Sequence, residues 1–281
     1  MLEINRFVSV SARELEALPY YEMIARLGLL SFNIQGCKPM DLIAEYGAVS
    51  ASSEVLIVGC GTGGTAVHLA ETTPASVYGV DVSPESVRMA QERAVASPAR
   101  DRLRFSVGDA SALTSAPDTF DVVVTEYVAF FLPPASFEGF FRVLKPGGLL
   151  ALAEMMKDPE VGNKADAKIL AAEASYSDLV GYAFHLPTAD EYMAMLRRAG
   201  FDDVRVRNRF VEPSMRETAR SLGGWGGLFS ISVAALRLMM SSPVLRRRFV
   251  QAGRVKNTLI KSRSTAKYVF QGIITGRKPF Q

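Results

Sequence analysis

The clearest pattern in the chain is a run of four apolar residues, 55–58, that leads directly into a glycine-rich stretch. A short apolar run of this kind is typical of a buried strand, and glycines at 59, 61 and 63 permit a tight turn with positive φ. The residues after the turn are compatible with a helix, whose first N–H groups lack partners within the helix. The pattern therefore predicts a strand, a turn and a helix that together can hold a ligand.

Similar strands follow at regular intervals. Residues 77–82, 104–110 and 120–126 each have an acidic residue at or near the end, and a fifth strand is expected after the turn at 142–148. Strands alternating with helices to about residue 155 predict a parallel sheet covered by helices on both faces. Ligands in that architecture bind at the carboxyl ends of the strands.

The C-terminal part is expected to add two more strands to this sheet, separated by a long segment. A helix is expected over residues 188–199, because Thr188 and Glu191 have the spacing of a capping box. Residues 204–211 alternate apolar and basic side chains, which predicts a half-exposed sixth strand. The next convincing strand is 267–278, so about 55 residues separate the last two strands.

The interrupting residues, 213–266, are too many for a bare loop. Residues 225–240 are strongly apolar, with Arg237 as their only charge, and apolar residues recur at helical spacing in the basic stretch that follows. We therefore expect an inserted subdomain of two or three helices.

The start of the chain has two helix-like pieces, 11–29 and 39–46, joined by a turn-prone segment that contains Asn33. The expected division is a helical cap at 1–50, a core at 51–212, the insertion at 213–266 and a final core strand at 267–281.

The glycine turn alone leaves the ligand open. Gly59, Gly61 and Gly64 satisfy the dinucleotide pattern G-x-G-x-x-G, and Asp81 ends the next strand, where its carboxylate can accept both ribose hydroxyls. An NAD-dependent oxidoreductase therefore fits this element as well as any other nucleotide-binding protein does.

Two later motifs distinguish between the possible nucleotide ligands. Gly108-Asp109-Ala110 ends strand three, and Leu-Lys-Pro-Gly-Gly at 144–148 precedes strand five. With the glycine turn and Asp81, they resemble the class I S-adenosylmethionine (SAM) methyltransferases. The resemblance implies an α/β, Rossmann-like, doubly wound seven-stranded sheet with an antiparallel last strand, here with an N-terminal helical cap and a helical insertion between strands six and seven. It also implies SAM as cofactor and S-adenosylhomocysteine as product. The cofactor-binding residues that it implies are Gly59, Cys60, Gly61, Gly63, Asp81, Val82, Asp109, Ala110 and Glu126.

One position departs from the family pattern. The family usually has an acid two residues before the first glycine, where this chain has Ile57. The ammonium group of SAM would then rely on backbone carbonyls near Gly59 and Glu126, on the Glu126 side chain, or on a residue from the N-terminal segment. The departure keeps open a SAM-binding or membrane-associated protein without catalysis.

Methyl transfer from SAM needs mainly alignment of the acceptor and, for some acceptors, a base. The resemblance places Glu126 and Tyr127 beside the transfer position and His185 in a segment that borders the acceptor pocket. Tyr21, with its neighbour Tyr20, could flank the ligand from the cap, and Glu154 is a weaker candidate. The remaining histidine, His68, is expected to be packed in the core.

Charge singles out the C-terminal region. The chain carries +3 overall, but residues 213–281 hold 13 Lys or Arg and one acid, Glu217. This region therefore carries +12, and the first 212 residues carry −9. Three readings of the insertion remain: helices packed on the sheet or on a second subunit, a lid over a small or lipophilic acceptor with a basic helix that approaches an anionic membrane or substrate, and a nucleic-acid surface. The last is disfavoured because few aromatics accompany the basic residues.

The remaining expectations concern metals and location. Cys37 and Cys60 match no zinc or disulfide spacing, so no metal site is expected. A reduced, cytoplasmic setting follows, with peripheral membrane contact and a homodimer left open, and neither a leader peptide nor a membrane span is indicated.

Overall fold

A computed structural model describes residues 11–27, 36–210 and 224–280. Its contacts divide the chain into two compact units. Unit 1 combines three stretches, 1–36, 160–185 and 211–269, and unit 2 comprises 37–159, 186–210 and 270–281.

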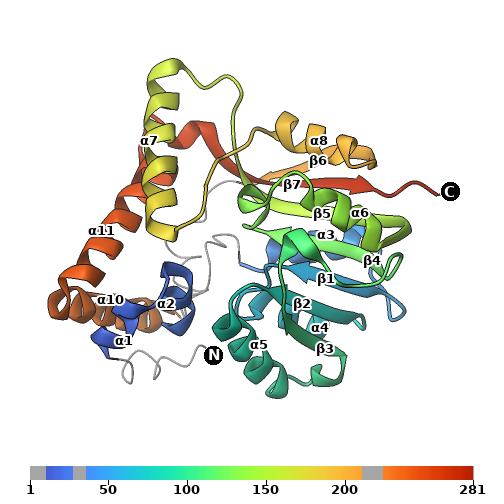
Figure 1. The fold of residues 1–281 in the computed structure, drawn as a ribbon, viewed down its shortest axis with the longest axis horizontal. Helices are drawn as coiled ribbons and strands as arrows, with labels where there is room; N and C mark the ends of the chain where they lie inside the picture. The colour runs from blue at the N-terminus through green and yellow to red at the C-terminus, as the bar shows by residue number, and fades with distance from the viewer. Residues whose placement is uncertain (1–10, 28–35, 211–223, 281) are drawn as a thin grey trace. The chain divides into compact units, whose positions relative to one another are not determined.

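Unit 2 is built on a seven-stranded sheet of order β3-β2-β1-β4-β5-β7-β6 (Figure 1). Strands β1 to β5 pair in parallel, and β6 pairs antiparallel with β7. This confirms the predicted α/β sheet and its reversed end. The strands are β1 Glu54–Val58, β2 Ser76–Asp81, β3 Leu103–Val107, β4 Phe120–Glu126, β5 Leu144–Lys157, β6 Asp202–Phe210 and β7 Val269–Arg277.

The central strands β1, β4 and β5 are buried on both faces of the sheet. Side chains alternate along β1, so that Val55 and Ile57 join one core cluster and Leu56 and Val58 the other. Helices α3 Lys38–Tyr46, α4 Gly64–Thr72 and α5 Pro84–Val95 contribute to the first cluster, and α6 Ser136–Val143 and α8 Ala189–Arg198 to the second. Burial on both faces explains why the central strands are continuous apolar runs.

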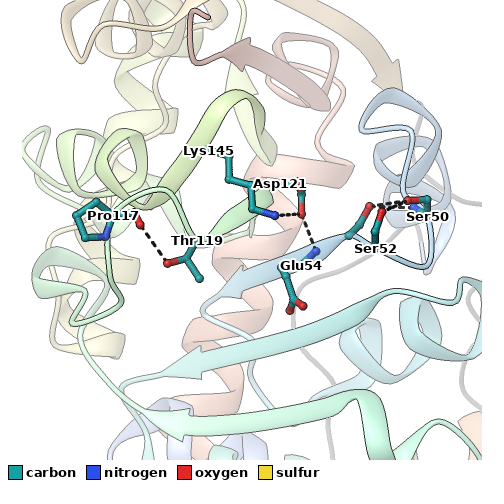
Figure 2. Close-up of polar contacts among 8 residues, drawn as sticks. Ser50, Ser52, Glu54, Pro117, Thr119, Asp121 and Lys145 are labelled. Carbon is teal, nitrogen blue, oxygen red and sulfur yellow. Dashed lines mark hydrogen bonds and ion pairs between the residues drawn. The ribbon is translucent and has the colours of Figure 1, made fainter. Parts of the chain in front are cut away.

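The amino ends of three strands are tied together by Asp121. Its Oδ2 accepts hydrogen bonds of 2.8 Å from the backbone N–H of Glu54 on β1 and from the Lys145 ammonium on β5 (Figure 2). Lys145 belongs to the Leu-Lys-Pro-Gly-Gly stretch, which the structure places inside β5 rather than before it. The pairing of β4 with β5 shifts register there, and Gly147 has φ of +79°.

The capping box before α8 is present as predicted. The Thr188 side chain accepts from the Glu191 N–H, and the Glu191 carboxylate accepts from the Thr188 N–H. The short 3-10 turns of unit 2 are Arg100–Arg102, Ala110–Ala112 and Ala129–Phe131.

Unit 1 is helical. Its described elements are α1 Ala12–Ala17, α2 Tyr20–Arg26, α7 Asn163–Val180, α10 Gly224–Ser241, α11 Pro243–Lys256, a π-helical turn Asn257–Lys261 and a 3-10 turn Ala266–Tyr268. Helix α11 packs against α7, α10 and α1. Gln251 on α11 donates to the Ser175 carbonyl of α7 at 2.7 Å, and Arg248 donates to the Leu18 carbonyl after α1 at 2.9 Å.

Two features of the helices differ from the sequence-based expectation. The first helix is broken at Pro19, because proline lacks an N–H and disfavours the helical conformation in the residue before it. Helix α7 was not predicted at all, and its segment belongs to unit 1 rather than to the sheet unit. The expected turn around Asn33 and the start of the insertion, 213–223, lie outside the described residues.

Candidate active site

The glycine turn after β1 lies at the carboxyl edge of the sheet, beside the point where the strand order reverses between β1 and β4. Gly59, Gly61 and Gly63 have φ of +68°, +53° and +77°, and Gly63 is the N-cap residue of α4. A Cβ on Gly59 would lie 2.2 Å from a methyl of Val128, whereas a Cβ on Gly61 would meet nothing within 4 Å. Gly59 is therefore packed against Val128, whereas the space beside Gly61 is free of protein atoms.

Asp81, at the end of β2, braces this turn. Its Oδ2 accepts from the Gly61 N–H at 2.8 Å and its Oδ1 from the Ser83 N–H at 2.9 Å. Burial raises the pKa of Asp81 above its ordinary value, although the backbone N–H groups oppose the shift. The Val82 N–H also bonds this carboxylate. Two carboxylate oxygens have about four lone-pair sites in all, so the three backbone donors leave acceptor capacity for a ligand hydroxyl.

Asp109 begins the turn after β3. Its Oδ1 accepts from the Ser111 N–H at 2.8 Å and from the Ser111 hydroxyl at 2.7 Å, and these bonds lower the pKa of Asp109. Two apolar side chains at this edge are exposed, Val82 at 61% and Val107 at 54%. Sequence reasoning missed Val107, although an apolar residue next to Gly108 at a strand end was the available signal.

The end of β4 is strained. Tyr127 is buried and has φ of +56°, a region that bulky residues seldom occupy. The following backbone is held by Glu154 of β5, whose Oε1 accepts from the Thr125 hydroxyl, the Val128 N–H and the Ala129 N–H. Glu126 is partly exposed at this edge. Glu154 therefore supports the turn that carries Glu126 and Tyr127.

Two other predicted positions face the protein interior. Ile57 is buried in the first core cluster, with 1% exposure. The Cys60 side chain is buried too, and burial raises the pKa of its thiol. Only the backbone of Cys60 is therefore suited to a ligand.

Tyr21 and His185 belong to unit 1, where α7 connects them. The Tyr21 and Tyr176 hydroxyls lie 3.1 Å apart, and the Tyr176 ring packs edge-on against Phe184. His185 is exposed, and its Nδ1 lies 3.2 Å from Oε2 of the buried Glu173. Sequence reasoning missed Tyr176 and Glu173 because it did not recognise α7.

The structure thus groups the predicted residues into two sets. The sheet edge of unit 2 holds Gly59, Cys60, Gly61, Gly63, Asp81, Val82, Asp109, Ala110, Glu126 and Tyr127. The unit 1 set is Tyr21 and His185. Within the described residues there is no group of His, Cys, Asp or Glu that could hold a metal ion.

The sheet-edge set fits a nucleoside. The Asp81 carboxylate offers acceptors for two neighbouring hydroxyls, and the exposed Val82 and Val107 offer apolar surface for a flat base. The open turn at Gly61 lets a ligand approach the backbone closely.

Comparison with known proteins identifies the relatives of this chain. The profile of a methyltransferase domain matches residues 55–148. The chain is 30% identical to methyltransferase GfsG of Streptomyces halstedii, over 65% of this chain and 71% of that protein. It is 36% identical to erythromycin 3''-O-methyltransferase of Saccharopolyspora erythraea, over 64% of this chain. The chain spans 61% of the length of that erythromycin enzyme.

A solved structure shows the same fold. Phosphoethanolamine N-methyltransferase 2 of Haemonchus contortus, in complex with phosphomonomethylethanolamine and S-adenosylhomocysteine, superposes with a TM-score of 0.61 at 18% identity. The match covers 96% of this chain and 61% of that one.

Proposed function

Because the chain belongs to the class I SAM-dependent methyltransferase family, we propose that it transfers a methyl group from SAM to a small or lipophilic acceptor. The observation that carries the proposal is the Asp81 carboxylate, braced by the Gly61 and Ser83 amides beside an open turn. The relatives do not support the alternatives of an NAD-dependent oxidoreductase or a non-catalytic SAM-binding protein.

The cofactor's nucleoside end is assigned to the sheet edge of unit 2. Asp81 would accept the two ribose hydroxyls, and the free Oδ2 of Asp109 would accept from the adenine amino group. The Ala110 N–H would donate to the ring, and Val82 and Val107 would contact its faces.

The methionine end must be held without Ile57, because that side chain is packed in the core. The groups proposed for the cofactor's ammonium are the Glu126 side chain and the backbone carbonyls near Gly59. The strained backbone at Tyr127 supports this assignment, since strain of this kind clusters at ligand sites.

SAM supplies a methyl group already activated by its sulfonium, so the protein's tasks are alignment and, where the acceptor carries a proton, its removal. On chemical grounds His185 is the proposed base. The buried Glu173 carboxylate accepts from His185 Nδ1–H and leaves Nε2 available for the acceptor's proton. Tyr21 and Tyr127 are proposed as groups that orient the acceptor.

The proposed partner is therefore a small-molecule acceptor, which fits the family. Among the helices of the described residues, none combines the length and the apolar character that a bilayer span requires. A cytoplasmic location with peripheral membrane contact through 213–266 is part of the proposal, and a homodimer is not needed for it.

The test is calorimetric titration of the full chain with SAM, S-adenosylhomocysteine and NAD. Asp81→Ala should weaken binding of both adenosyl ligands at least tenfold, because it removes both hydroxyl acceptors. Asp101→Ala is the matched control, since the Asp101 side chain is 92% exposed away from the described contacts of Asp81. Binding of NAD, or no binding of SAM by protein with native circular dichroism, would overturn the proposal.

A further inference from the structure

Helix α10 presents a stripe of large apolar side chains to solvent. Trp225, Phe229, Leu236 and Met240 are 62%, 72%, 54% and 79% exposed. At 100° per residue these four positions fall within an arc of about 60°, and the stripe is about 22 Å long. We call this set of four residues the α10 stripe.

Scattered exposed apolar residues are ordinary, but four large ones on one helix face, with only the exposed Ser232 between the two pairs, mark a surface that contacts something else. Helix α10 has a buried side as well, because Leu238 is only 8% exposed. The apolar character of the α10 stripe is therefore additional to what packing within unit 1 needs.

Helix α11, which follows α10 in the chain, carries strong positive charge. Helix α11 starts two residues after α10 ends, and its Arg246, Arg247 and Arg254 line a groove of about 520 Å³ together with Ser175 and Val250. No carboxylate within the described ranges forms an ion pair with any of these three arginines. Residues 213–281 as a whole carry 13 basic residues and one acid.

The charge argues against a second copy of this chain as the occupant. A two-fold dimer through the α10 stripe would bring the same basic helices toward each other, and like charges at an interface oppose association. An anionic surface has the complementary charge. Helices that lie in a lipid interface combine Trp, Phe and Leu on one side with basic residues nearby.

We propose that α10 docks on an anionic lipid bilayer, with the α10 stripe in the boundary between headgroups and acyl chains and the α11 arginines against lipid phosphates. A lipophilic acceptor dissolved in the bilayer would reach the docked protein directly. The inference therefore rests on the proposed function and adds a membrane as the source of the acceptor. Lipid binding is measured without cofactor or acceptor, so its failure and the failure of methyl transfer are separate results.

The chain contains one tryptophan, Trp225, and it is part of the α10 stripe. Its fluorescence therefore reports on this surface alone. The full chain is mixed with phosphatidylcholine vesicles that contain either no phosphatidylglycerol or 30% of it, and co-sedimentation is measured in parallel. We expect a blue shift and co-sedimentation with the anionic vesicles that decline as salt is raised.

Two variants test the two parts of the surface while Trp225 is retained. Phe229→Ser with Met240→Ser should abolish the blue shift. Arg246→Gln with Arg247→Gln should weaken vesicle binding about fivefold per arginine. The matched controls are Val95→Ser and Arg100→Gln, which change an exposed valine and an exposed arginine of unit 2.

Equal binding to neutral vesicles, or binding unchanged in both double variants, would overturn the proposal. A blue shift without vesicles that grows with protein concentration would identify a second copy as the occupant, and would overturn it as well.

Discussion

The carboxylate of Glu154 accepts a 3.0 Å hydrogen bond from the amide of Ala129, three residues beyond the end of β4. Glu154 is fully buried, and its Oε2 has no hydrogen-bond partner among the residues that the structure describes. Burial raises the pKa of Glu154 to about 7, against the opposing effect of the Ala129, Thr125 and Val128 donors. The backbone that follows the strained Tyr127 is thus hydrogen-bonded by a carboxyl group whose pKa lies near neutral pH.

Glu154 should make folding stability depend on pH. Its folded pKa of about 7 lies above the ordinary 4.5, so the folded state holds its proton more tightly than the unfolded state. The contribution of this proton to the free energy of unfolding is complete below pH 4.5 and is lost as pH rises through 7. We expect Glu154→Gln to remove a fall on the order of 3 kcal/mol in the unfolding free energy between these values. Urea unfolding at a series of pH values measures it, and an unchanged slope in the variant would contradict the assignment.

His68 should make folding stability depend on pH in a higher range than Glu154 does. Its Nε2 lies 2.6 Å from Asp41 Oδ1, and hydrogen bonds to Cys37 and Asp41, opposed by burial, raise its pKa to about 9. The stabilisation is therefore present below about 6.5 and is lost as pH rises through 9. His68→Gln should flatten the fall in the urea midpoint between pH 7 and 10, and Asp41→Asn should lower the pH at which it occurs. Identical profiles in wild type and His68→Gln would refute this.

His185→Gln should lower kcat for a hydroxyl acceptor by 10²- to 10⁴-fold, the range for loss of a general base, with SAM affinity unchanged. Glu173→Gln should reduce kcat less, because Glu173 orients the imidazole rather than touching the acceptor. Conversion of SAM to S-adenosylhomocysteine is followed as a function of pH, with His68→Gln as the control that keeps its rate. If His185→Gln retains the wild-type pH profile, the base lies elsewhere.

The two glycines of the turn should respond differently to alanine. Gly61→Ala meets open space, so its cost is the left-handed backbone alone, about 1–2 kcal/mol. Gly59→Ala adds a clash with Val128, which costs a further ~1–3 kcal/mol unless the turn moves. Thermal unfolding of the two variants measures the difference, and equal destabilisation would show that Val128 moves aside freely.

The sheet and the location of its candidate site could be predicted because each strand end is marked locally, by glycines at 59–63, by Asp81 and by Gly108-Asp109. Parallel strands bring those ends to one edge, so their common location follows from topology. The role of Glu154 could not be predicted, since its partners lie 25 to 29 residues away in sequence and meet it only through the pairing of β4 with β5.

Helix α7 was missed for a different reason. Its buried positions Ile169, Ala172, Tyr176 and Val180 do follow helical spacing, but alanines and polar residues dilute the apolar stripe. His68 was expected in the core because its neighbours Val67 and Leu69 are buried, yet the residue itself faces Asp41 and is partly exposed.

The three separate stretches that form unit 1 also set an order for biosynthesis. Helices α1 and α2 leave the ribosome before the other described helices of unit 1, yet the Leu18 carbonyl acquires its Arg248 partner only after some 230 further residues have been added. The strands from β1 to β5 can pair long before that point, whereas β6 must wait for β7. Until α11 has been synthesised, α1 and α2 therefore lack their α11 contacts, and in that period a chaperone would find them accessible.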